Sequence, residues 1–120
     1  MEKIKSYRDL VAWKRSHDLV LMVYRFSALF PKSEIFGLTS QMRRCAVSVT
    51  SNIVEGFARK GTKEKIQFYY QAKASLTELQ SQLEICRDLD FLTNEDYIQT
   101  EERVEECHRL LGGLIKNQKG

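Results

Sequence analysis

Apolar side chains recur every three or four residues through most of the chain, which is the spacing of one face of an α-helix. This pattern predicts four helices, at about Tyr7–Phe30, Leu38–Ala58, Lys63–Asp88 and Asn94–Lys116. Four helices joined by short connections pack as antiparallel neighbours. The predicted fold class is therefore all-α, an antiparallel up-down-up-down four-helix bundle in which residues 1–120 form a single domain.

The first predicted helix is bounded by two local signals. Ser6 and Asp9 have the spacing of a capping box, and Pro31 cannot continue a helix. Apolar and aromatic residues lie on more than one side, so we expect its middle to be buried nearly all round: Leu10, Trp13, His17, Val20 and Tyr24 on one side, with Leu19, Met22, Val23, Phe26 and Phe30 beside them.

The third and fourth predicted helices carry narrower apolar seams at alternating spacings of three and four. Thr62 is the expected N-cap of the third helix, and Thr93 with Asp96 approximates a capping box for the fourth. The two seams are Tyr69, Ala72, Leu76, Leu79, Leu83 and Cys86, and then Val104, Cys107, Leu111 and Leu114. We expect them to meet in one core.

The second predicted helix has a polar line between two apolar flanks. The line consists of Gln41, Arg44, Ser48, Asn52, Glu55 and Arg59, and the flank opposite the main apolar face holds Val47, Val54 and Ala58. A second flank implies a second packing partner, either a neighbouring helix or another subunit. Three interpretations stay open: a solvated face, a groove for a ligand or nucleic acid, and a network that specifies assembly, which we favour. Arg44 with Glu55, and Ser48 with Asn52, are the expected hydrogen-bonding sets.

Charge is unevenly distributed along the chain. Residues 1–60 hold 11 Lys/Arg and 5 Asp/Glu, whereas residues 61–120 hold 8 and 11. A basic half suggests an anionic partner, although the two halves could also simply attract each other. The candidate nucleic-acid contacts are Lys14, Arg15, Arg43, Arg59, Lys60, Lys63 and Lys65. Ordinary solubilising charge is the alternative.

Two blocks of the second helix resemble the four helix bundle protein family, first named for proteins encoded in intervening sequences of bacterial 23S rRNA genes. They run from Gly37 to Ser48 and from Asn52 to Arg59. Tyr7 to Trp13, Phe30-Pro31 and Ala74 to Leu79 resemble other blocks of the family, so the resemblance extends from Tyr7 to about Leu92. Cys45 and Ala74 depart from its usual alanine and glycine.

The resemblance implies a four-helix bundle that is commonly assembled as a ring-shaped homopentamer. It also implies a relationship in fold to the accessory variability determinant of diversity-generating retroelements, which binds nucleic acid and partners a reverse transcriptase. No biochemical activity is established for most of the family, so the resemblance implies no particular activity. A polar network or subunit interface made of Gln41, Arg44, Val47, Ser48, Asn52, Val54 and Glu55 fits the family's most recognisable block.

Catalytic and metal chemistry find little support in the sequence. Cys45, Cys86 and Cys107 stand alone on three predicted helices and lack the close pairs typical of zinc sites. Glu105 and His108 supply one copy of a di-iron signature that requires two. His17 is expected to be a packed or interfacial residue rather than a general base. We therefore expect no enzyme activity, no metal and no cofactor.

The functional hypothesis is a non-enzymatic, oligomeric accessory protein that binds RNA or DNA through phosphate contacts. The alternative is a scaffold that binds a protein partner through its assembled ring. The longest apolar run, Leu19 to Tyr24, is far too short for a membrane span, and no signal-peptide pattern follows the charged first residues. A cytoplasmic location without membrane association is the expectation.

Overall fold

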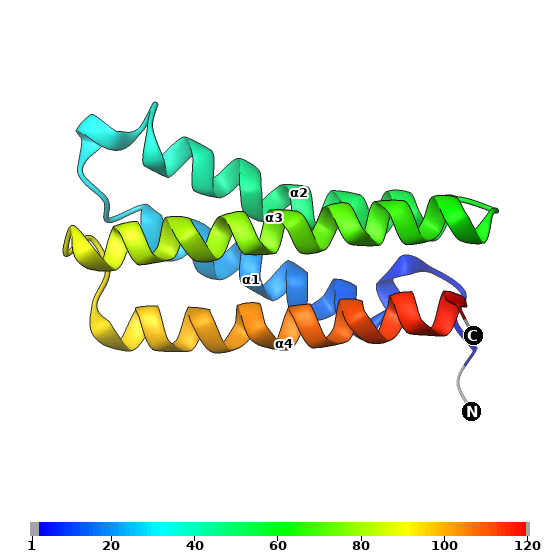
Figure 1. Ribbon diagram of the computed structural model, residues 1–120. Coiled ribbons are helices and arrows are strands. Elements are labelled where there is room, and N and C mark those ends of the chain that lie inside the picture. Colours follow the sequence, from blue (N-terminus) through cyan, green and yellow to red (C-terminus); the bar gives the residue numbers. More distant parts are fainter. Residues whose placement is uncertain (1–2, 120) are drawn as a thin grey trace.

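A computed structural model describes residues 3–119, which form four α-helices and two short 3-10 helices. The long helices are α1 (Val11–Ser27), α2 (Leu38–Ala58), α3 (Thr62–Asp88) and α4 (Asn94–Lys119), with η1 at Tyr7–Asp9 and η2 at Lys32–Glu34. Each helix reverses the direction of the one before it, which confirms the predicted all-α bundle (Figure 1). Among the described residues, no helix is both long and apolar enough to cross a bilayer.

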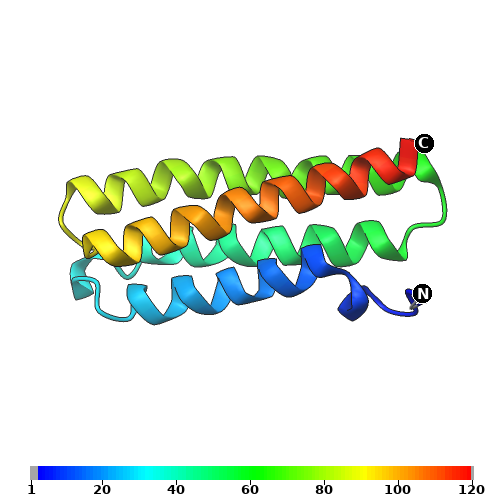
Figure 2. The same cartoon turned by 90° about the horizontal axis from the view of Figure 1, so that it is seen from below.

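The four helices run side by side along the molecule (Figure 2). Helix α1 packs against α2 and α4, and α3 packs against the same two helices. The bundle is elongated, with principal extents of 44 × 26 × 20 Å. Because the chain runs up and down, both described termini and the α2–α3 connection lie at one end, and the other two connections lie at the other (Figure 1).

The predicted seams of α3 and α4 form the centre of this core. All six seam residues of α3 are buried, as are Val104, Cys107 and Leu111 of α4. Leu114 is only half-buried, and Ile115 occupies the buried position in its place. The single core that was predicted from these seams is confirmed apart from that last turn.

Helix α1 differs from its prediction in extent and in burial. Its first turn separates as η1, where the predicted capping box of Ser6 and Asp9 is present. At the other end the chain tightens into 3-10 turns after Ser27, so the helix ends three residues before Phe30. Only one face is buried, with Leu19 and Val23 at its centre, whereas Tyr24 remains 43% exposed. The prediction of burial nearly all round was wrong, because no packing partner covers the outer side of α1 within residues 3–119.

The remaining helix ends follow from local hydrogen bonds. Thr62 is the first residue of α3 rather than its cap, since Gly61 holds the N-cap position without a side-chain bond. The Thr93 hydroxyl accepts a hydrogen bond from the Asp96 amide at 3.1 Å, which supports the predicted start of α4. Helix α2 begins and ends at the predicted residues.

Helices α2 and α3 approach each other closely at Gly56. A Cβ atom added there would lie 2.6 Å from Cε1 of Tyr69, 2.9 Å from its Cδ1 and 3.1 Å from Cβ of Phe68. Any side chain larger than hydrogen would collide with the buried ring of Tyr69. Gly56 therefore sets how closely the two helices pack near their connection.

Candidate functional site

The basic side chains gather at one end of the bundle. We call this the basic end and define it as residues 3–9, 55–65 and 116–119. It brings together the N-terminal segment, the α2–α3 connection and the last turn of α4 (Figures 1 and 2). It holds nine lysines and arginines against three carboxylates, and the basic residues are Lys3, Lys5, Arg8, Arg59, Lys60, Lys63, Lys65, Lys116 and Lys119.

The opposite end has the reverse balance. Residues 25–38 and 84–96, which we call the acidic end, hold three basic and six acidic side chains. The charge asymmetry in the sequence is thus an asymmetry along the long axis of the molecule. Sequence reasoning missed the contribution of Lys116 and Lys119, although the up-down topology predicts that the last turn of α4 lies beside the first residues of the chain.

Two of the predicted contacts at the α2–α3 connection have structural partners. The Lys65 ammonium donates hydrogen bonds to the backbone carbonyls of Phe57, at 2.7 Å, and Gly56, at 3.3 Å. It thereby bonds to carbonyls in the last turn of α2, where a positive charge also opposes the helix dipole. The Arg59 guanidinium lies 3.2 Å from a Glu55 carboxylate oxygen and 4.8 Å from the centre of the Phe68 ring.

Lys60 and Lys63 are the most accessible of the predicted contacts at this connection. Both are exposed. Within residues 3–119 their ammonium groups form no hydrogen bond and no ion pair. They are therefore available to an external anion without first breaking a contact in the protein.

The three other predicted contacts lie outside the residues that define this end. Lys14 is exposed in the first turn of α1, five residues after Asp9. Arg43 is half-buried near the acidic end, where its guanidinium donates to Ser27 Oγ at 2.9 Å and lies 4.7 Å from the Tyr24 ring centre. The seven candidates thus do not form one continuous patch.

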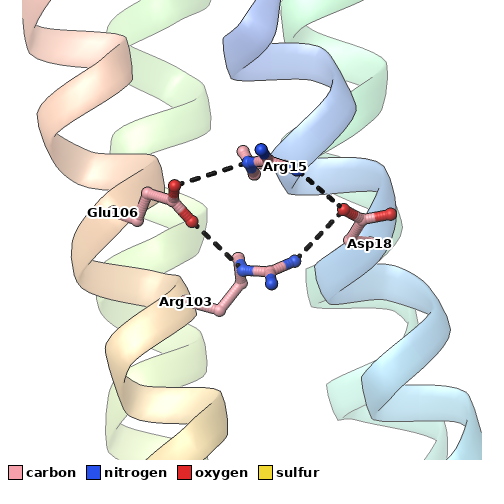
Figure 3. Close-up of polar contacts among 4 residues, drawn as sticks. All are labelled: Arg15, Asp18, Arg103 and Glu106. Carbon is pink, nitrogen blue, oxygen red and sulfur yellow. Dashed lines mark hydrogen bonds and ion pairs between the residues drawn. The ribbon is translucent and has the colours of Figure 1, made fainter.

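Arg15 belongs to a ring of four alternating charges that joins α1 to α4 (Figure 3). Its guanidinium lies 3.4 Å from Asp18 and 3.4 Å from Glu106. Arg103 closes the ring at 3.2 Å from Asp18 and 3.1 Å from Glu106. Partly exposed pairs of this kind each contribute about 0–1 kcal/mol, so the ring mainly fixes the relative position of the two helices.

The polar line of α2 follows the groove between α2 and α3. The Asn52 amide donates to the Ser48 carbonyl at 2.8 Å and to the Ser48 hydroxyl at 3.1 Å, as predicted. The Ser48 hydroxyl also lies 3.0 Å from that of Ser75. The predicted pairing of Arg44 with Glu55 was wrong: the two are 11 residues apart, about 16 Å along one helix. Glu55 pairs with Arg59 instead.

Arg44 faces a shallow polar hollow of about 250 Å³ at the other end of this line. The hollow is lined by Gln41, Arg44, Cys45, Ser48, Ser75 and Glu78. The far flank of α2 is open in the single chain, since Val47 is 38% exposed, Val54 is half-buried and Ala58 is exposed. The line therefore lies between a packed surface and an uncovered apolar flank.

The three cysteines have poor chemistry for a nucleophile or a metal ligand. Burial, followed by the nearby Glu78 carboxylate, raises the pKa of Cys45 to about 12, and burial also raises the pKa of Cys86 to about 12. Burial raises the pKa of Cys107 as well. Thiols with raised pKa values stay protonated at neutral pH. In the described part of the chain, no three His, Cys, Asp or Glu side chains come together as a metal site would require.

One protein-family model matches most of the chain. Its description is "23S rRNA-intervening sequence protein", and it matches residues 8–113. No match to a curated protein is found. A solved structure from Bacteroides thetaiotaomicron, described as a protein with unknown function from the S23 ribosomal protein family, has a similar fold. It superposes with a TM-score of 0.81 at 20% identity and covers 88% of this chain and 96% of its own. Neither description is that of an enzyme.

Proposed function

Because this chain belongs to the 23S rRNA-intervening sequence protein family, we propose that it is a non-enzymatic accessory protein that binds nucleic acid through phosphate contacts at its basic end. The observation that carries this proposal is the gathering of nine basic side chains and three acidic ones at that end. Phosphates are held by lysine and arginine without regard to sequence, and binding releases counterions from the nucleic acid.

The arrangement of the basic end suits a phosphate backbone better than a small anion. Its charges come from three segments that are far apart in the sequence, and the exposed Lys60 and Lys63 lie in the α2–α3 connection and in the first turn of α3. Spread charges of this kind meet successive phosphates, whereas a small anion needs converging donors. With no recognised base-reading motif in the sequence, the binding should be nearly independent of sequence.

We propose in addition that the protein works as an oligomer, with a pentamer favoured by the family. The open flank of α2, with Val47, Val54 and Ala58, is the surface that a second copy would cover. Assembly would place several basic ends on one particle. Weak phosphate binding at each would then combine into a much higher affinity through avidity.

The test compares two charge-matched double variants in titrations of labelled RNA and DNA at low salt. Lys60→Gln with Lys63→Gln removes two charges from the basic end, and Arg25→Gln with Lys32→Gln removes two from the acidic end. The first variant should bind more weakly than the wild type to unrelated sequences alike, while the second should bind as the wild type does. Equal effects of both variants, or no binding by the wild type, would overturn the proposal.

A scaffold function is the second candidate, and one observation favours it. The α1–α2 connection exposes three large apolar side chains, with Leu29 86%, Ile35 52% and Phe36 95% exposed. Apolar groups that gather on one exposed connection are typical of a surface that binds protein. If the wild type binds no nucleic acid, replacement of Phe36 with serine should abolish partner binding under the scaffold hypothesis.

A further inference from the structure

A small hollow adjoins the basic end, between the last turns of α4 and the third and fourth turns of α3. It has a volume of about 330 Å³ and is lined by Tyr70, Lys73, Gly112, Ile115, Lys116 and Lys119. The volume is at the lower limit of pockets that hold small organic ligands. It is thus large enough for one flat group but too small for an element of a folded partner.

The charged side chains that line this hollow are all positive. Lys119 Nζ lies 3.2 Å from the Tyr70 hydroxyl and 5.6 Å from the centre of the ring. Lys73 reaches across from α3 and donates to the His108 carbonyl on α4 at 3.2 Å. With Lys116, three ammonium groups surround a lining that contains no carboxylate among the residues described. An anionic ligand would find no opposing charge there.

Tyr70 supplies an aromatic surface in the same place. Its side chain is 48% exposed although its neighbour Tyr69 is fully buried. Aromatic rings beside lysines on an open surface stack well on nucleic-acid bases, and such stacking is tolerant of sequence because every base has a π-face. The phosphates on either side of the base can then reach the lysines.

Gly112 lines the hollow and Gly113 follows it in α4, and packing within the chain requires neither glycine. A Cβ at Gly112 would find its nearest atom at 3.9 Å, the Lys73 ammonium, and a Cβ at Gly113 would have nothing within 4 Å. Each glycine inside a helix costs about 1 kcal/mol relative to alanine. Two such residues in succession thus weaken α4 beside the hollow, and Gly112 leaves its backbone uncovered there.

The hollow continues the surface of the basic end along α3. Lys63, Tyr70 and Lys73 are separated by seven and three residues, so they share one face of the helix. Lys63 and Tyr70 are about 10 Å apart along the axis. A strand held at Lys63 can therefore continue to the hollow without leaving the protein surface.

We propose that this hollow binds one unpaired nucleotide of a single-stranded nucleic acid, with the base stacked on Tyr70 and the adjoining phosphates on Lys73, Lys116 and Lys119. The inference rests on the proposed function and narrows it to single strands. In a duplex the faces of the bases are covered by their neighbours, so the ring of Tyr70 cannot reach them. A duplex would use the lysines alone.

The experiment titrates labelled single-stranded RNA, single-stranded DNA and duplexes of equal length with the oligomeric wild type and three variants. Tyr70→Leu removes the ring while keeping an apolar side chain, Tyr70→Phe keeps the ring, and Gly112→Leu fills the hollow. The wild type should prefer single strands. Tyr70→Leu and Gly112→Leu should weaken single-strand binding about ten-fold and leave duplex binding unchanged, and Tyr70→Phe should bind as the wild type does.

Three results would overturn this inference and leave the proposed function standing. One is that the wild type binds single strands and duplexes equally and that Tyr70→Leu changes neither affinity. This result would leave phosphate binding at the basic end intact. Another is an equal loss of both affinities in Tyr70→Leu, which would mean that the ring recognises no base. The third is a particle mass of Tyr70→Leu that differs from that of the wild type on light scattering, which would make Tyr70 a subunit contact. A wild type that binds neither form removes the proposed function as well.

Discussion

Among single residues, Leu79 is a direct test of the predicted core. It is fully buried on α3, within the seam that faces α4. Leu79→Ala should lower the free energy of unfolding by about 2–5 kcal/mol, because apolar burial is reduced and a cavity remains. Urea unfolding followed by circular dichroism measures this change. A cost below about 1 kcal/mol would mean that the seam is not the centre of the core.

His108 should make the stability of the bundle depend on pH. Burial, and then the nearby Lys73 ammonium, lower the pKa of His108, while Glu105 opposes the shift. The unfolded chain therefore takes up the proton first as the pH falls below about 6.5, and the folded state loses stability between there and the lowered pKa.

The variant His108→Gln removes this titration and retains an amide that can bond to Gln80, which lies 3.3 Å from the imidazole. Unfolding free energies measured at pH 7.5 and pH 5 should fall more for the wild type than for the variant. The comparison cancels the titration of the other groups, since both proteins share them. An identical pH dependence in the two proteins would contradict the assigned environment of His108.

At the scale of helices, two glycines of the same chain should respond in opposite ways to alanine. At Gly56 the new methyl group would collide with the Tyr69 ring, so Gly56→Ala should destabilise the bundle by about 1–3 kcal/mol. At Gly113 no atom lies within 4 Å of the added Cβ, so Gly113→Ala should stabilise α4 by up to about 1 kcal/mol. Thermal melts of both variants measure the pair.

Stabilisation by Gly56→Ala would show that α2 and α3 do not approach as closely as Tyr69 and Gly56 do in this structure. Destabilisation by Gly113→Ala would show that the open surface of α4 is covered by something other than solvent. Each variant adds one methyl group to the wild type, at a glycine within a helix. Their comparison therefore isolates the effect of helix packing from helix propensity.

Sequence periodicity predicted the helices well because each apolar seam repeats over several turns. Helix α2 begins and ends where it was predicted, and Thr93 marks the start of α4. The periodicity did not predict the burial of α1, where exposed apolar residues such as Leu21 and Tyr24 have the same spacing as buried ones. Spacing alone cannot distinguish a face that packs within the chain from a face that is left open.

At the scale of the whole molecule, the open flank of α2 predicts self-association. Val47→Arg places a charge at a position that is 38% exposed in the single chain, so the fold should tolerate it while an interface should not. Leu21→Arg on α1, at 39% exposed, is the matched control. Light scattering at micromolar concentration should find an oligomer for the wild type and the control, and a smaller particle for Val47→Arg. A wild-type monomer would refute assembly.

The candidate site was less predictable than the fold, because charges become a surface only when the chain is folded. The sequence singled out Arg59 to Lys65 but also Arg15, whose charge is neutralised by Asp18 and Glu106. It missed Lys116 and Lys119, which the topology brings beside the N-terminal segment. Side-chain partners such as these depend on helix rotation, and the spacing of polar residues does not determine it.

Binding of phosphates at the basic end should make the affinity for nucleic acid depend on salt. The dissociation constant for a labelled single strand is measured by fluorescence anisotropy from low to physiological salt for the wild type and for Lys60→Gln with Lys63→Gln. The logarithm of the wild-type affinity should fall linearly with the logarithm of the salt concentration, and the double variant should have a slope shallower by about 1.4, or 0.7 for each phosphate that the variant no longer neutralises. An affinity that does not change with salt, or a double variant with the wild-type slope, would show that the basic end does not bind phosphates.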